Sequence, residues 1–251
     1  MAMAASGPAR SAEIYSADYS VSLLGLRLAS SHFVTIVDEG GFTAKGTVST
    51  AGLMRVFDRT DGETTVSGHI DGQGVAPVSY RVEYRYGKKA TAVRIDFAHG
   101  DVVRAERTPP QKKKGDWVDV RPADLKSVAD PLSAMLVKAP DARAVCDRTL
   151  RIFDGSTRFD LKLAFAGWQN FDTDGFKGTA TSCRVTFVPV SGYRRGVFAM
   201  DYLRREKDMR ITFASLGDSG IYAPVFARVG TQIGDVTVYA TKFQMGAGRA
   251  N

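Results

Sequence analysis

The chain has 251 residues, of which 44% are hydrophobic and 24% charged, and its net charge is +7. These values exclude a disordered chain and a collagen-like repeat. The sequence contains no run of about 18 apolar residues, which excludes a transmembrane helix. The chain is long enough to bury the core of one large domain.

Apolar and polar residues alternate in short runs from Tyr19 nearly to the C-terminus, which indicates antiparallel strands with one buried face. The clearest run is 78–86, where valine and tyrosine alternate with serine, arginine and glutamate. A helical turn is expected at 52–57. The strands expected in the first half are 17–24, 26–37, 42–49, 63–70, 78–86, 90–98 and 101–106.

The middle of the chain has a different pattern. Residues 108–115 combine Pro109-Pro110 with three lysines, so an exposed loop is expected there. From 123 to 137 apolar residues recur at helical spacing, with Asp130 as a cap before Pro131. The apolar residues of this insert are Leu125, Val128, Leu132, Met135 and Leu136.

Alternation then resumes to the C-terminus. The strands expected there are 149–153, 158–166, 180–188, 210–216, 221–229 and 236–243. The predicted fold class is mainly β, with a single curved antiparallel sheet, a half-barrel or spiral, and a short mid-chain helical insert. One domain is expected over 13–245, between flexible tails at 1–12 and 246–251.

The two cysteines, Cys146 and Cys183, are too few for a zinc site. A disulfide between them would close a loop of about 38 residues and stabilise the fold by about 3.5–4 kcal/mol. Such a bridge implies an oxidising compartment. Two buried free thiols explain the same residues, and the residues alone leave both alternatives open.

Several short motifs resemble, in the same order, those of one family. They are Ala17-Asp18-Tyr19-Ser20-Val21, Leu24-Gly25-Leu26, Asp130-Pro131-Leu132-Ser133-Ala134-Met135-Leu136, Val145-Cys146-Asp147-Arg148, Phe153-Asp154-Gly155, Cys183 with Pro189, Gly192-Tyr193-Arg194-Arg195 and Ala240-Thr241-Lys242-Phe243. The family is the exported proteobacterial group of domain of unknown function 3108. The resemblance runs from about residue 17 to 243.

This resemblance implies export to the periplasm, a signal peptide already removed, and the disulfide. It also implies a half-barrel sheet wrapping a helix, similar to lipoprotein-localisation carriers and envelope-integrity proteins. By that analogy the concave face would hold an acyl chain or an apolar segment of a partner. The family brings no catalytic residues to this sequence.

Six apolar residues are therefore candidates to face a hydrophobic ligand. If the insert covers the open side of a half-barrel, these side chains line the space between insert and sheet. The alternative is ordinary core packing. The six residues are Phe159, Leu161, Leu163, Phe165, Leu132 and Met135.

The positive charge is concentrated between 81 and 114, where ten lysines and arginines face four acidic residues. A patch formed there suits anionic lipid headgroups, lipopolysaccharide or acidic glycan, or it is a solvated face. Nucleic acid is not expected, because the sequence has no nucleic-acid-binding motif. The patch consists of Arg81, Arg85, Arg94, Arg104, Lys112, Lys113 and Lys114.

Two motifs resemble reactive sites. Gly217-Asp218-Ser219-Gly220 resembles a protease nucleophile loop but is favoured as a turn, because no histidine stands in a base motif. Asn170, Asp172 and Asp174 reproduce part of a calcium loop, yet the twelfth position is Thr181, so a hairpin turn is favoured over weak calcium binding.

The sequence favours a non-enzymatic periplasmic factor of the cell envelope. Its expected partner is a lipid, a lipoprotein or an envelope protein, with peripheral membrane contact and no cofactor. A structural interaction module without a ligand cavity is the alternative. A hydrolase is the least supported class.

Overall fold

The computed structural model describes residues 12–38, 40–51, 60–72 and 74–247. A 14-stranded sheet dominates this part of the chain, and its named strands pair antiparallel. The strands of its first half are β1 (Glu13–Leu23), β2 (Leu26–Asp38), β3 (Gly41–Thr50), β4 (Thr60–Asp71), β5 (Gly74–Tyr86), β6 (Lys89–Ala98) and β7 (Asp101–Thr108). These strands form a meander, because each pairs antiparallel with the next strand in sequence.

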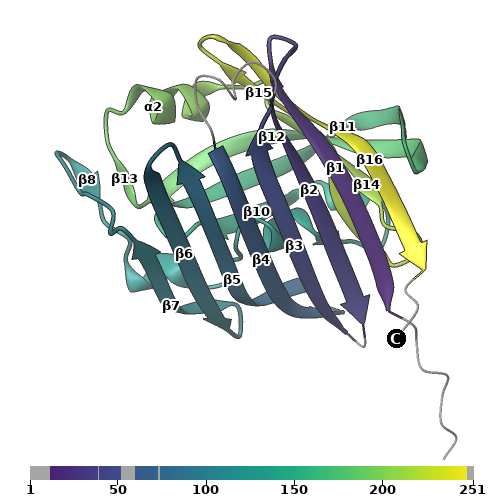
Figure 1. The fold of residues 1–251 in the computed structure, drawn as a ribbon, viewed down its shortest axis with the longest axis horizontal. Helices are drawn as coiled ribbons and strands as arrows, with labels where there is room; N and C mark the ends of the chain where they lie inside the picture. The colour runs from purple at the N-terminus through teal and green to yellow at the C-terminus, as the bar shows by residue number, and fades with distance from the viewer. Residues whose placement is uncertain (1–11, 39, 52–59, 73, 248–251) are drawn as a thin grey trace, which may run out of the picture.

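The second half supplies the other wall of the sheet. Its strands are β9 (Val137–Lys138), β10 (Arg148–Phe153), β11 (Arg158–Thr173), β12 (Phe176–Ser191), β14 (Arg210–Ser215), β15 (Ile221–Thr231) and β16 (Gly234–Ala247). A separate two-stranded sheet joins β8 (Trp117–Val118) to β13 (Tyr193–Arg194). In Figure 1 strands β2 to β7 form the wall nearest the viewer, and β10 to β12 cross behind it.

The strand order is β10-β11-β12-β14-β15-β16-β1-β2-β3-β4-β5-β6-β7, with β9 beside β15. Strand β1 therefore pairs with both β2 and β16, which brings the first and last strands together in the middle of the sheet. The two ends of the order, β7 and β10, do not pair with each other. The sheet curls but does not close into a barrel, as the predicted fold class requires.

The mid-chain insert lies between the two walls. It holds the 3₁₀ helices η1 (Pro122–Leu125), η2 (Ser133–Met135) and η3 (Arg143–Val145), together with β9. We call residues 122–147 the strap. Strap residues belong to or pack against each of the three apolar clusters of the core, through Val128, Leu136 and Val145 among others.

Helical spacing in 123–137 predicts more helix than the strap contains. Its backbone leaves helical geometry after η1, and Ser127 has a φ of 50°. Ala129 then forms a parallel bridge with Ile152 of β10, and Pro131 disfavours the helical region for the residue before it. Val128 is buried and the other apolar residues are partly buried because sheet lies on both sides of the strap, so an amphipathic helix is not needed to cover them.

Other expectations have a clear outcome. The expected strands all form, and most are longer than expected, β11 by seven residues at its C-terminal end. Residues 109–114 form the expected exposed loop. The α-helix of the described residues, α2 (Phe198–Arg205), was not expected. The helical turn expected at 52–57 lies outside the described residues, as do most residues of the expected tails, although β16 continues to Ala247.

Candidate functional site: an apolar cavity inside the sheet

A cavity of about 330 Å³ lies where the strap meets the inner face of the central strands. This volume falls at the lower end of the range for small-molecule pockets. Strands β1, β2, β3, β14, β15 and β16 supply most of its wall, and η2 with its flanking residues supplies the rest. The lining residues are Tyr15, Ser16, Ala17, Tyr19, Ser31, Phe33, Thr35, Ala44, Leu132, Met135, Leu136, Ile211, Leu216, Ala223, Pro224, Ala227, Val238 and Phe243.

The cavity wall is apolar because the inner positions of β1 and β2 carry aromatic and small residues. Tyr19 and Phe33, on neighbouring strands, pack edge to face with ring centroids 5.8 Å apart. The Tyr19 hydroxyl donates a hydrogen bond to the Pro224 carbonyl oxygen at 2.7 Å. Burial raises the pKa of the Tyr19 hydroxyl, so it stays neutral and acts as a fixed donor within the wall.

Asp130 shapes the strap beside the cavity. Its Oδ1 accepts hydrogen bonds from the backbone N–H groups of Leu132 and Ser133, at 2.9 and 3.0 Å. The Ala134 N–H donates to the Asp130 carbonyl oxygen. Asp130 therefore makes cap-type hydrogen bonds, as predicted, but to the turn that leads into η2, whose own N-cap position is Leu132. The Asp130 side chain is fully buried, and this burial raises the pKa of the carboxyl group.

Buried polar contacts fasten the strap to β11. The Arg158 guanidinium is 2% exposed. Its Nε donates to the Asp124 carbonyl oxygen at 3.0 Å, and Nη1 donates to the Asp160 carboxylate at 2.6 Å. Because a buried guanidinium needs partners for its donors, this arginine fixes the start of the strap to the sheet.

A disulfide between Cys146 and Cys183 fastens the other end of the strap to β12. Both residues are buried, and their Cα atoms lie 5.6 Å apart. The Thr181 hydroxyl adds a bond of 2.9 Å to the Ala142 carbonyl oxygen. The bridge that the family resemblance implies is therefore formed.

The six predicted ligand-facing residues separate into two groups. Leu132 and Met135 line the cavity. Leu161, Leu163 and Phe165 instead pack in the cluster around the disulfide, where the Arg143 guanidinium lies 4.5 Å from the Phe165 ring centroid. The fourth strand residue, Phe159, stacks on Phe187. The β11 residues do not line the cavity, because β12 and β14 separate β11 from β15, and β16 and β1 lie farther along the sheet order.

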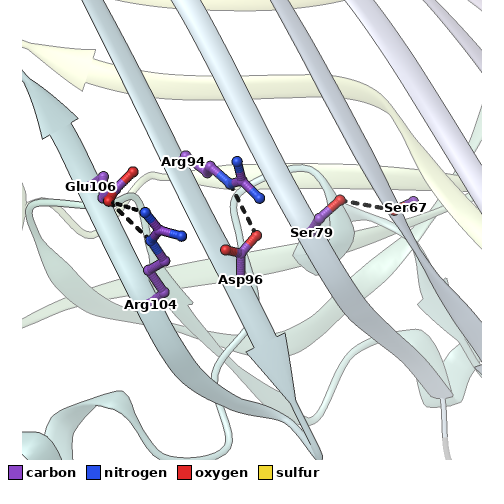
Figure 2. Close-up of polar contacts among 6 residues, drawn as sticks. All are labelled: Ser67, Ser79, Arg94, Asp96, Arg104 and Glu106. Carbon is purple, nitrogen blue, oxygen red and sulfur yellow. Dashed lines mark hydrogen bonds and ion pairs between the residues drawn. The ribbon is translucent and has the colours of Figure 1, made fainter.

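The predicted basic patch carries acidic partners. Figure 2 shows Arg94 beside Asp96 and Arg104 beside Glu106, each pair on one strand, at 3.3 and 2.5 Å. The nearby Ser67 and Ser79 hydroxyls bond across β4 and β5. Arg81 and Arg85 are exposed on β5, and Lys112 to Lys114 lie in the exposed loop, where Lys113 contacts Asp119. Alternating charge therefore covers this face, and its binding of an anionic partner stays a prediction.

The first reactive-looking motif forms a turn, and the second lies on the end of a strand and in the hairpin that follows it. The Ser219 hydroxyl donates to the Leu216 carbonyl oxygen and accepts the Ile221 N–H, which completes the turn between β14 and β15. Asn170 and Asp172 lie on β11, and Asp174 lies in the hairpin to β12. The Asp172 carboxylate pairs with Lys177 at 2.8 Å. Within the described residues, no group of three or more histidine, cysteine and acidic side chains is placed to hold a metal.

Most of the cavity wall was missed by sequence reasoning. Tyr15, Ala17 and Tyr19 show the alternation of a half-buried strand, so their inward direction is readable from sequence. Their pairing with β16, more than 200 residues away, is not. Local pattern shows which face is buried but not which distant strand lies beside it.

The fold and cavity define a class of protein: an open, curled antiparallel sheet that holds an internal strap beside an apolar cavity. The family described as "Protein of unknown function (DUF3108)" matches residues 15–241, and the chain belongs to this family. No curated protein matches the chain. Among solved structures, the chain is similar to a β-barrel-like protein of domain of unknown function DUF1849 from Brucella abortus. The two share 12% sequence identity with a TM-score of 0.47, and the match covers 94% of this chain and 98% of that chain. No helix in the described part of the chain is long and apolar enough to cross a membrane.

Proposed function

We propose that this protein is a non-enzymatic factor of the bacterial cell envelope that binds the acyl chain of a lipid or lipoprotein in its apolar cavity. The observation that carries the proposal is the cavity wall. Its polar groups are few, and the Tyr19 hydroxyl already bonds within the wall, so an apolar occupant does not leave this buried hydroxyl unpaired.

The lining also supports a binding rather than a catalytic role. The cavity-lining residues of the described chain include no histidine, lysine, arginine, cysteine or carboxylate. A serine, threonine or tyrosine of the wall would need such a side chain beside it as a base to act as a nucleophile. The disulfide and the family membership support a periplasmic location, because disulfides persist in oxidising compartments.

The test is native mass spectrometry with lipid extraction on protein purified gently from the periplasm. We expect a stoichiometric co-purifying lipid. Ala227 is half-buried and lines the cavity, so Ala227→Phe should fill the space and remove the bound lipid. Ala164 is exposed on β11, and Ala164→Phe serves as the matched control that keeps it.

A fluorescent fatty acid gives a second measurement on delipidated protein. Wild type and Ala164→Phe should bind the probe, and Ala227→Phe should not. An apo mass for wild type together with no probe binding would contradict the proposal. Equal lipid content in wild type and a folded Ala227→Phe variant would also contradict it.

A further inference from the structure

Three large apolar side chains project from two adjacent hairpin ends. Leu24, in the β1–β2 turn, is 69% exposed, Leu26, the first residue of β2, is 72% exposed, and Ile233, in the β15–β16 turn, is 70% exposed. The Leu24 N–H donates to the Asp235 carbonyl oxygen, and a Cβ at Gly234 would overlap the Leu24 side chain. The two turns therefore touch, and Figure 1 shows both at the upper end of the sheet. We call Leu24, Leu26 and Ile233 the apolar tips.

The backbone conformation and the exposure of the tips are unfavourable for the chain on its own. Leu24 has a φ of 50°, in the left-handed region where glycine or asparagine is common and a bulky residue is rare. Hairpin turns favour Asn-Gly and Asp-Gly, whereas this turn is Leu24-Gly25 followed by a second exposed leucine. A strained, solvent-exposed leucine at a turn indicates a contact made outside the chain.

A row of arginines crosses the outer face of the sheet just inside the tips. Arg184 of β12 lies opposite Arg210 of β14, which lies opposite Arg228 of β15. The register continues through Thr237 and Ser22 to Arg27 of β2. Directly opposed residues share a face, and neighbouring strands are about 4.8 Å apart. The row therefore places four guanidinium groups on one surface.

This arginine row is only partly neutralised. Arg228 pairs with Asp235 at 2.9 Å and lies near Glu206. For Arg27, Arg184 and Arg210 no ion pair occurs among the residues that the structure describes. Like charges directly opposed across strands are unfavourable, so the Arg184–Arg210 pair favours an anionic partner.

We propose that the apolar tips insert into an anionic lipid bilayer surface while the arginine row binds headgroup phosphates. The tips extend about one to five residues beyond the row, or roughly 3–16 Å at strand rise, and apolar anchors penetrate about 5–10 Å into the headgroup and acyl boundary. Projecting side chains on two turns suit a deformable bilayer. This docking surface does not depend on what the cavity holds.

The test is flotation with vesicles of phosphatidylcholine alone and with vesicles of an equal mixture of phosphatidylcholine and phosphatidylglycerol. Wild type should bind only the mixed vesicles, and added salt should weaken that binding. The tip variant Leu24→Asn, Leu26→Ser, Ile233→Ser should reduce the partition coefficient by more than about tenfold. Arg184→Gln with Arg210→Gln should reduce it by about 25-fold, since each arginine near the surface contributes about fivefold.

Matched controls separate position from composition. Val103 is 64% exposed on β7, and Arg151 is exposed on β10 outside both the basic patch and the arginine row, so Val103→Ser and Arg151→Gln should bind vesicles like wild type. Leu24→Asn alone should raise the thermal midpoint while it weakens binding, because asparagine tolerates the left-handed backbone. A folding defect would lower both.

The proposal is overturned if wild type ignores both vesicle types or binds them equally, or if the tip and arginine variants bind like wild type. It is also overturned if sedimentation shows a dimer that the tip variant dissociates, because the tips would then contact a second copy. The Ala227→Phe variant should keep vesicle binding. Its loss of lipid cargo therefore tests the proposed function separately.

Discussion

Removing the disulfide should destabilise the protein without unfolding it. Replacing Cys146 and Cys183 together by alanine releases the C-terminal end of the strap from β12. The Thr181 bond to Ala142 and the β9 pairing with β15 remain, so the strap keeps other attachments. We expect a folded variant whose strap amides exchange faster with solvent.

The magnitude follows from the loop that the bridge closes. The two cysteines are 37 residues apart in sequence. The chain-entropy relation gives a loss of about 3.9 kcal/mol at 25 °C for a loop of this length. A chain of 251 residues has an unfolding entropy of about 0.5 kcal/mol/K, so the thermal midpoint should fall by about 7 °C.

Urea unfolding of three samples measures this effect. Oxidised wild type, reduced wild type and the double alanine variant are compared, because reduced wild type keeps both sulfur atoms and separates loss of the tether from loss of packing. Equal unfolding free energies for oxidised and reduced protein would refute the reasoning. Unfolding of the reduced protein in the absence of urea would show that the remaining strap contacts are weaker than the structure indicates.

Three further changes test the strap and one turn. In wild type, Asp130 makes a stability contribution that is fully present below the ordinary carboxyl pKa and is lost as pH rises through its raised folded pKa. Asp130→Asn should remove this contribution, so urea unfolding should show the unfolding free energy of the variant rising relative to that of wild type as pH rises. A difference that stays constant with pH would contradict this. Arg158→Met should lower the unfolding free energy by about 3 kcal/mol or more in the same assay, and a loss below about 1 kcal/mol would show that the buried guanidinium is dispensable. Gly192 has a φ of 78°, and a Cβ there would overlap the Ser156 carbonyl oxygen. Gly192→Ala should therefore lower the unfolding free energy by more than about 2 kcal/mol. Gly72 lies in open space, so Gly72→Ala should change the thermal midpoint little.

Sequence pattern predicts the strands well because their signal is local. The run 78–86 alternates over its whole length, and β5 occupies Gly74–Tyr86. Helix α2 was missed because it is only two turns long, so its apolar residues are too few to establish a helical period in the sequence. Short elements on the surface give weak periodic signals whatever their type.

Charge on a face depends on cross-strand register, which sequence alone does not supply. The excess of basic residues from 81 to 114 predicts a basic patch, yet Arg94 and Arg104 each lie beside an acid two positions along the same strand, a neighbour that the period of two makes readable from the sequence. The arginine row was not predicted, because Arg27, Arg184 and Arg210 are far apart in sequence and adjacent only through the sheet order. Net charge along the chain and net charge across the sheet are therefore different quantities.

The irregular backbone of the strap has a physical cause in the open sheet. An open sheet leaves unpaired N–H and C=O groups on its two edge strands. The strap bonds near both edges: the Val128 N–H donates to the Gly100 carbonyl oxygen beside β7, and Ala129 exchanges bonds with Arg151 and Phe153 of β10. A helix would satisfy its own backbone groups and leave these edges bare. The helical spacing of 123–137 therefore indicates burial on two sides, and the need to bond the open edges determines the backbone that the strap adopts.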